Sequence, residues 1–335
     1  MKRANDAEQL SHHLPGGGFR NPWPGGSLHG TRGLLKWMLT RSRTPNPARP
    51  LLSAPSLPEL PLEASERPRI TWIGHSTFLI QAGGLNILTD PIWSDRASPL
   101  LFAGPKRLVP PGLRFSDLPR IDVTLLSHDH YDHLDRPTVE NLIARFPEMT
   151  WITPLGVADF IKSRDAKTVR ELDWWDDTIV GKATIGCTPA QHFSGRLPWN
   201  RNSTLWCGWT VRIGDFSLFF AGDTGLHPEF RRIAEQFGPF DLAILPIGAY
   251  EPRWFMQPVH MSPEEAVQSF RDLTSASSAS PSRRCIMLGS HWGTFRLTDE
   301  PVDEPPALAR ATWNQANLPA DDLWIFTQGE IRTMK

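Results

Sequence analysis

The stretch Ser127-His128-Asp129-His130-Tyr131-Asp132-His133 directly follows the apolar run Ile121-Asp122-Val123-Thr124-Leu125-Leu126. The apolar run predicts a buried strand, and the polar cluster would then lie at the strand end, where loops present functional side chains. Imidazole and carboxylate groups suit zinc and similar divalent ions. The H-x-H-x-D-H spacing cannot wrap every side chain around one ion. It can place the first two histidines on one ion and the Asp-His pair on a neighbouring ion, so the stretch predicts a metal centre.

Length and composition restrict the class of protein. The 335 residues carry a net charge of -1 at pH 7, which is enough chain for one large core and argues against a general nucleic-acid binder. The sequence has no apolar run of transmembrane length and no recognisable secretory signal after Met1. Three widely spaced cysteines, Cys187, Cys207 and Cys285, form no disulfide framework. We therefore expect a cytoplasmic protein without a nucleic-acid partner.

Residues 1–66 are rich in proline and glycine and predict an extended arm ahead of a domain over residues 67–335. From Met1 to Pro50 the arm has eight basic residues against Asp6 and Glu8. The segment Leu34–Leu39, flanked by arginines, could form a short basic amphipathic helix for peripheral contact with an anionic membrane. The alternative is an arm that packs Leu34 and Trp37 onto the main domain.

Strand and helix signals alternate through the domain. Strands are predicted over 70–74, 77–80, 86–89, 123–126, 151–153, 169–174, 183–189, 241–246 and 285–289, with a hairpin of 206–213 and 216–221 that turns at Gly214-Asp215. Helices are predicted over 137–146, capped by Asp135, and over 262–273, opened by a Ser262/Glu265 capping box. Residues 93–119 predict a long functional loop, and 274–284 a Ser-rich surface loop. This pattern indicates an α/β sandwich of one domain.

Three further polar residues, His192, Asp223 and His291, follow apolar strands. H-x-H-x-D-H followed by these three in this order resembles the metallo-β-lactamase-fold hydrolases. The resemblance implies an αββα sandwich with two metal ions at one edge of its paired sheets. It further implies these ligands: His128, His130 and His192 for the first ion, Asp132, His133 and His291 for the second, and Asp223 as the bridge.

The resemblance also implies the chemistry. Two ions about 3.5–4 Å apart can share a hydroxide that is a nucleophile at neutral pH, and Asp132 would orient the attacking water or accept its proton. We expect zinc, although iron or manganese could use the same ligands. The members of the fold that cleave β-lactams lack an aspartate at the bridging position, so Asp223 disfavours antibiotic hydrolysis.

Further motifs resemble the N-acyl-phosphatidylethanolamine-hydrolysing phospholipase D group. They include Asn21-Pro22-Trp23-Pro24, Trp72-Ile73-Gly74-His75-Ser76-Thr77, Thr89-Asp90-Pro91-Ile92, Gly104-Pro105-Lys106-Arg107, His192-Phe193-Ser194-Gly195-Arg196, the run from Ile247 to Met256, and His291-Trp292-Gly293-Thr294-Phe295. The resemblance implies a phosphodiesterase that releases an N-acylethanolamine and phosphatidic acid. His260 and His75 are candidates to contact phosphate or to support ligands, and Asp90 to accept a hydrogen bond from a ligand histidine.

Other functions stay open at this point. The same metals and hydroxide would serve a hydrolase of a soluble ester, lactone or thioester, which the ligand motif cannot separate from a phospholipase. A nuclease is disfavoured by the net charge. A metal-binding module without turnover is a third possibility, although no ligand is missing. A sheet edge or the basic arm could also form a homodimer contact.

Overall fold

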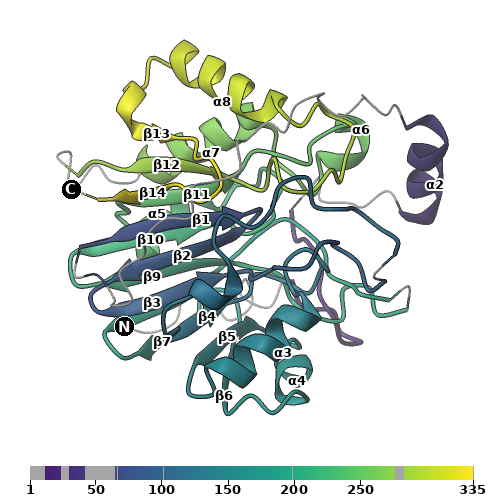
Figure 1. Cartoon of the computed structure of the whole chain (residues 1–335). Coiled ribbons are helices and arrows are strands. Elements are labelled where there is room, and N and C mark those ends of the chain that lie inside the picture. The colour runs from purple at the N-terminus through teal and green to yellow at the C-terminus, as the bar shows by residue number, and fades with distance from the viewer. Residues whose placement is uncertain are drawn as a thin grey trace.

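The computed structural model describes residues 12–23, 30–41, 65, 67–100, 102–197, 199–275 and 283–334. Two seven-stranded sheets lie face to face, and helices cover their outer faces (Figure 1). This arrangement is the αββα sandwich that the family resemblance implies, and it confirms the predicted fold class.

The first sheet has the strand order β14-β1-β2-β3-β4-β5-β6. β1, β2 and β3 form an antiparallel meander, whereas β3 to β6 run parallel and β14 pairs antiparallel with β1. The bounds are β1 Arg69–Gly74, β2 Thr77–Ala82, β3 Leu85–Thr89, β4 Val123–Leu125, β5 Thr150–Pro154, β6 Thr168–Leu172 and β14 Ile331–Thr333.

The second sheet has the order β13-β12-β11-β10-β9-β8-β7 and the same mixed character. β7 to β10 are antiparallel, and β10 to β13 are parallel. The bounds are β7 Asp177–Val180, β8 Ala183–Thr188, β9 Gly208–Ile213, β10 Phe216–Phe220, β11 Leu242–Pro246, β12 Ile286–Ser290 and β13 Leu323–Trp324. The predicted β9–β10 hairpin is confirmed.

These pairings bring polar residues to one edge of the sandwich. β1, β3 and β4 share one direction in the first sheet, and β8, β10 and β12 share one direction in the second. The carboxyl ends of strands with a common direction meet at one edge of a sheet, where α/β folds bind ligands. All the residues that the sequence places after these strands therefore gather in one region.

The helices cover the outer faces of the sheets (Figure 1). α3 (Arg136–Arg145) and α4 (Ala158–Lys162) lie beside β4 to β6, whereas α5 (Phe230–Phe237), α7 (Pro263–Ser275) and α8 (Glu304–Gln315) lie beside the second sheet. The remaining helical segments are α2 (Gly30–Thr40), α6 (Arg253–Met256) and the 3₁₀ turns η2 (Phe115–Asp117) and η4 (Ala320–Asp322).

The two predicted helix starts have different outcomes. The Ser262/Glu265 capping box is confirmed, because the Ser262 amide donates to Glu265 Oε2 and the Glu265 amide to Ser262 Oγ. The capping role of Asp135 was wrong. Asp135 occupies the N-cap position of α3, but its carboxylate accepts hydrogen bonds from the hydroxyls of Ser94 and Thr138 and none from a helix amide.

The main core lies between the sheets, and a smaller one lies beneath α3 and α4. Two contacts tie the second sheet to the loop after β4. The Trp209 indole donates to the Leu126 carbonyl at 2.9 Å, and the Cys207 amide donates to the Ser127 carbonyl at 2.9 Å. The packed core therefore fixes the start of the histidine-rich stretch.

Two parts of the predicted arm are described. Residues 12–23 pack against Trp174 in the segment after β6, and the predicted helix over Leu34–Leu39 is confirmed as part of α2. α2 lies beside α6, with the Trp37 ring stacked on Phe255 and its indole donating to Asp299. Apart from Ser65, the other arm residues lie outside the described ranges, as does most of the Ser-rich loop, and the boundary at residue 66 stays a prediction. Within those ranges every helix is too short or too polar to span a bilayer.

Candidate metal centre

Three imidazoles from two sheets converge at the edge of the sandwich. His130 Nδ1 lies 2.8 Å from His128 Nε2 and 3.2 Å from His192 Nε2. His128 and His130 come from the loop after β4, and His192 follows β8 in the other sheet. Three nitrogens at such distances form one face of a metal-ligand shell.

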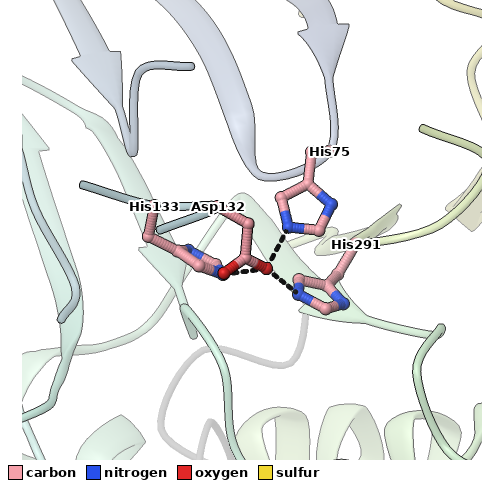
Figure 2. A group of neighbouring side chains, drawn as sticks. All are labelled: His75, Asp132, His133 and His291. Carbon is pink, nitrogen blue, oxygen red and sulfur yellow. Dashed lines mark hydrogen bonds and ion pairs between the residues drawn. The ribbon is translucent and has the colours of Figure 1, made fainter. Parts of the chain in front are cut away.

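A second group lies beside the first, around the Asp132 carboxylate (Figure 2). Asp132 Oδ2 is 3.4 Å from His133 Nε2 and 3.5 Å from His291 Nε2. His75, at the end of β1, donates from Nε2 to the same oxygen at 2.8 Å. This group can hold a second ion, with His75 either as a support for Asp132 or as a further ligand.

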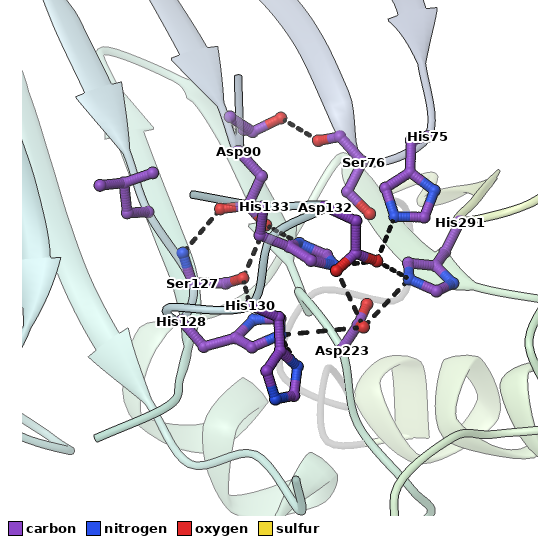
Figure 3. Close-up of polar contacts among 12 residues, drawn as sticks. His75, Ser76, Asp90, Ser127, His128, His130, Asp132, His133, Asp223 and His291 are labelled. Atoms are coloured by element: carbon purple, nitrogen blue, oxygen red, sulfur yellow. Dashed lines mark hydrogen bonds and ion pairs between the residues drawn. The ribbon is translucent and has the colours of Figure 1, made fainter. Parts of the chain in front are cut away.

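The Asp223 carboxylate lies between the two groups (Figure 3). Its Oδ2 is 3.1 Å from His133 Nε2 and 3.0 Å from His291 Nε2. The same oxygen is 4.0 Å from His128 Nε2 and 3.9 Å from His192 Nε2. One carboxylate therefore faces imidazoles of both groups, which is the position of a bridging ligand.

The unpaired polar atoms of the centre fit metal ions. Asp223 Oδ1 is buried without a hydrogen-bond partner, and the buried His133 Nε2 and His291 Nε2 face carboxylate oxygens at 3.0–3.5 Å without forming a hydrogen bond of regular geometry. An unpaired buried polar atom costs about 1–3 kcal/mol, so native proteins rarely retain several in one place without a ligand. Imidazole nitrogens and carboxylate oxygens are also the donors that zinc and related ions prefer. The residues present thus fit two divalent ions.

Hydrogen bonds on the far side of each ring set its orientation. His133 Nδ1 donates to Asp90 Oδ2 at 2.7 Å, and His192 Nδ1 donates to the Val259 carbonyl at 2.9 Å. Ser127 Oγ gives its proton to Asp90, so it must accept a proton from His128 Nδ1 at 2.9 Å. In all three rings Nε2 consequently faces the centre and is the atom that can bind a metal ion. Burial lowers the pKa of His133, but the carboxylates of Asp223, Asp132 and Asp90 outweigh burial and hold it well above its usual value, so this ring would release a proton when it binds a metal ion. The predicted contact between Asp90 and a candidate ligand histidine is confirmed.

The backbone is strained where these side chains enter the centre. His75, Asp90 and His291 have φ angles of 56°, 33° and 60°, which are unfavourable for residues with a Cβ atom. Gly222, just before Asp223, has a φ of 60°, and a Cβ atom there would lie 2.6 Å from the Ser127 Cβ. Glycine at position 222 therefore allows Asp223 to approach the loop after β4.

Burial controls the protonation of the first group. Desolvation lowers the pKa of His130 to about 3 and that of His192 to about 4, and it holds the pKa of His128 well below its usual value. These rings are consequently neutral at pH 7, the state that binds metal. At Asp223 burial raises the pKa, but the nearby His133 and His291 outweigh burial and hold it well below its usual value.

An apolar pocket of about 270 Å³ adjoins the centre. His260 belongs to both, because it lines the pocket while its Nδ1 lies 3.9 Å from Asp223 Oδ2. Phe193 also lines the pocket and packs edge-on against His130, with ring centroids 4.4 Å apart. The other lining residues come mainly from α2, α6 and the segment after β12: Gly30, Leu34, Trp37, Arg201, Phe255, Met256, Val259, Leu297 and Thr298.

The structure brings together all seven predicted ligands, namely His128, His130, Asp132, His133, His192, Asp223 and His291. His260, predicted with Asp132 to be catalytic, lies at the same centre. Metal binding and catalysis by these residues stay predictions. The roles of Ser127 and the Val259 carbonyl could not be predicted from the sequence, because contacts that orient a histidine from another segment leave no local motif.

Comparisons with known proteins agree with this architecture. Residues 85–283 match the family model described as the Beta-lactamase superfamily domain. An uncharacterised protein of Mycobacterium tuberculosis is 41% identical over 81% of this chain and 71% of its own length. N-acyl-phosphatidylethanolamine-hydrolyzing phospholipase D 1 of Caenorhabditis elegans is 42% identical over 70% of this chain and 67% of its own length.

Solved structures share the fold at lower sequence identity. Igni18, a metallo hydrolase of Ignicoccus hospitalis, superposes with a TM-score of 0.59 at 19% identity, over 80% of this chain and 98% of that one. The family match, the fold and the two His/Asp groups that both face Asp223 support the same assignment. The chain belongs to the metallo-β-lactamase superfamily as a metal-dependent hydrolase, and within it resembles the N-acyl-phosphatidylethanolamine-hydrolysing phospholipases D.

Proposed function

We propose that this hydrolase is a phosphodiesterase of the phospholipase D type. It would cleave N-acyl-phosphatidylethanolamine-like phospholipids into an N-acylethanolamine and phosphatidic acid, with two zinc ions as cofactors. The relative from Caenorhabditis elegans, 42% identical to this chain, carries that activity in its name. The same centre could also serve a soluble ester, lactone or thioester, so the substrate has to be argued from what surrounds the centre.

The observation that carries the proposal is the apolar pocket beside a carboxylate-bridged centre. Asp223 Oδ2 faces both imidazole groups, and His260 links that oxygen to the pocket. A phospholipid needs both surroundings, because it has a charged phosphodiester and long apolar chains. A small soluble ester or lactone would leave most of the pocket empty.

Different residues of the chain would have different roles in this reaction. When bound, two divalent ions supply a nucleophilic hydroxide at neutral pH and neutralise the phosphodiester charge. Asp132, which His75 holds through a hydrogen bond, would orient the attacking water and accept its proton. His260 lines the pocket and lies 3.9 Å from Asp223 Oδ2, so it could contact the phosphate. Trp37, Phe255 and Met256 would pack against an acyl chain.

We also propose that α2 brings the enzyme to a membrane surface. Leu35, Met38 and Leu39 are 60%, 65% and 81% exposed on this helix, and the arm around it is basic. Exposed apolar side chains on a basic helix suit an anionic lipid interface. α2 also forms one wall of the pocket through Leu34 and Trp37. A lipid could therefore pass from the membrane to the centre along one helix.

The decisive experiment measures hydrolysis of N-acyl-phosphatidylethanolamine in mixed micelles beside a simple lactone and a thioester. Wild type, Asp223→Ala and the control Asp177→Ala, which changes an exposed aspartate on β7, would be compared with metal content determined on each. We expect lipid cleavage that Asp223→Ala abolishes together with metal binding, and that Asp177→Ala leaves intact.

Other outcomes would contradict the proposal. Turnover of only the lactone or the thioester would keep the hydrolase but move its substrate to a soluble molecule. Two bound metals with no turnover of any substrate would favour a metal-binding module without catalysis. Activity that survives Asp223→Ala would show that the bridged centre is not the catalytic one.

A further inference from the structure

A second cluster of metal-ligating side chains lies on the N-terminal segment. His12 Nε2 is 2.7 Å from Asp173 Oδ1, and His13 Nε2 is 2.8 Å from Asp173 Oδ2. Among the described residues, five His/carboxylate groups have the spacing to hold an ion. Four of them are linked through His128, His133, His192 or Asp223 and form the centre already described, whereas the His12/His13/Asp173 group shares no residue with any of them.

The backbone makes the two neighbouring histidines converge. Residues 12–20 form a hairpin that turns through Pro15-Gly16-Gly17-Gly18, with His13 bridged to Phe19 and the Arg20 amide bonded to the His12 carbonyl. Successive side chains of an extended segment normally point to opposite sides. Here both rings instead direct Nε2 to the same carboxylate, with centroids 4.4 Å apart.

Aromatic packing holds these donors in place. The buried His12 ring stacks on Trp174 with a centroid distance of 4.1 Å, and the His13 ring meets the edge of Phe19 at 5.0 Å. The side chains of His13 and Asp173 are 31% and 18% exposed, so an ion can reach the cluster from solvent. Two imidazole nitrogens and one carboxylate oxygen are a zinc donor set that leaves a fourth position for water.

We propose that His12, His13 and Asp173 form a further zinc site that fastens the N-terminal hairpin to the sandwich. The ion takes the place of the two Nε2 protons that otherwise bridge each ring to the carboxylate. Asp173 follows β6, so the site joins the start of the chain to the first sheet. The same segment reaches the catalytic side, because Asn21 Nδ2 donates to the His192 carbonyl at 2.9 Å. The site is structural, and it does not depend on which substrate the enzyme cleaves.

The test counts zinc on the full-length protein. Metal-free protein would be dialysed to equilibrium against buffered zinc and its bound metal determined for wild type, His13→Gln, Asp173→Asn and Asp223→Ala. His13→Gln keeps a hydrogen-bond donor for Asp173 but removes a zinc ligand, and the position tolerates change because it is partly exposed. We expect His13→Gln and Asp173→Asn to bind one equivalent fewer than wild type, while Asp223→Ala loses catalytic zinc and keeps this equivalent.

Amide hydrogen exchange supplies a second readout. Zinc should slow exchange in peptides that cover residues 12–20 by about tenfold or more in wild type, because a fastened hairpin opens less often, and His13→Gln should remove that protection. Equal zinc content in wild type and both hairpin-site variants would overturn the proposal. It would equally fail if the exchange of these residues were the same with and without zinc, since hydrogen bonds alone would then hold the hairpin.

Discussion

His75 Nε2 lies 2.8 Å from Asp132 Oδ2, so a histidine at the end of β1 holds a carboxylate that the loop after β4 presents. The His75 backbone is itself fixed, because its amide donates to Thr294 Oγ1 at 2.6 Å and its carbonyl accepts the Trp72 indole at 2.9 Å. Two segments of the first sheet thereby determine the direction of one side chain of the metal centre.

This contact predicts the effect of removing His75. We expect His75→Ala to lower metal affinity or turnover by about 10–100-fold, as the loss of groups that orient metal ligands does in other metalloenzymes. His75→Gln, which can still donate to Asp132, should recover part of that loss. Titration of metal binding together with kcat measures both effects. Wild-type values for both quantities in His75→Ala would mean that Asp132 needs no support.

Asp90 predicts a larger effect on stability. Its buried carboxylate accepts hydrogen bonds from the Ser127 amide, Ser127 Oγ and His133 Nδ1 at 2.7, 2.6 and 2.7 Å. Asp90→Ala leaves all three donors unpaired, so we expect a loss of about 3 kcal/mol in the free energy of unfolding. Ser127→Ala removes one of these donors and leaves His128 Nδ1 without its acceptor, so it should cost less, about 2 kcal/mol. Denaturant unfolding of the two variants in parallel tests this order, and an equal loss in both would contradict it.

The sequence predicted the centre well because its residues follow strands whose apolar patterns are strong. β1, β2, β3, β8, β11 and β12 lie within about two residues of the predicted ranges. In a sandwich with this topology, residues after strands of common direction must meet at one edge. Placing His192, Asp223 and His291 beside the histidine-rich loop therefore required only the strands and the family resemblance.

What the sequence did not predict depends on contacts between distant segments. β7 has an exposed and alternating pattern too weak to identify, and β14 is a short edge strand defined by its pairing with β1. α5 and α8 were also missed, as neither begins with a side-chain cap. The association of His12 and His13 with Asp173 could not be predicted for the same reason, since no local pattern links residues 160 positions apart.

His227 predicts how stability depends on pH outside the metal centre. Its ring packs between Trp23 and Phe230, and burial lowers its pKa from 6.5 to about 3. The folded protein favours the neutral ring, whereas the ring in the unfolded chain takes up a proton near pH 6.5. The free energy of unfolding therefore falls as the pH falls from 6.5 towards 3. Between pH 7.5 and pH 5 this loss is about 2 kcal/mol.

His227→Phe keeps the aromatic stacking and removes the titration. Relative to wild type, we expect the free energy of unfolding of His227→Phe to gain about 2 kcal/mol between pH 7.5 and pH 5. The difference at pH 7.5 reflects packing and the loss of the hydrogen bond that the Glu229 amide donates to His227 Nδ1 at 3.3 Å. The other histidines titrate equally in both proteins, so their contributions cancel in the difference between the two free energies of unfolding. Parallel curves for the two proteins across this range would mean that His227 is not held neutral.

Trp37 tests the role of α2 as a wall of the pocket. Its ring stacks on Phe255 and its indole donates to Asp299 at 2.8 Å, so Trp37→Ala should loosen the helix from the domain. If an acyl chain lies in the pocket, kcat/KM for a long-chain lipid should fall about tenfold, equivalent to about 1.4 kcal/mol of lost apolar contact.

Hydrolysis of a small chromogenic diester, which has no acyl chain, separates the loss of acyl-chain contact from damage to the metal centre. Trp37→Ala should leave the rate of hydrolysis of this diester unchanged. Trp199→Ala is the matched control, because Trp199 is 80% exposed and lines no part of the pocket. An equal fall for the lipid and the small diester would show that α2 supports the metal centre instead of the substrate chain.

The outer face of α2 gives the last prediction, on binding to membranes. Trp37 and Lys36 face the domain, the latter with its Nζ 4.4 Å from the centre of the Trp254 ring, whereas Leu35, Met38 and Leu39 are exposed. The triple variant Leu35→Ser/Met38→Ser/Leu39→Ser should therefore bind anionic vesicles at least about tenfold more weakly, since each apolar side chain contributes roughly 1 kcal/mol or more at an interface. Ile179→Ser, at a residue 66% exposed on β7, should bind like wild type.

Sedimentation with vesicles at low and high salt measures both the apolar and the electrostatic contributions to binding, because salt screens only the basic charges. Equal sedimentation of the triple variant and wild type, with both folded, would remove α2 from any membrane contact and leave it as a wall of the pocket alone.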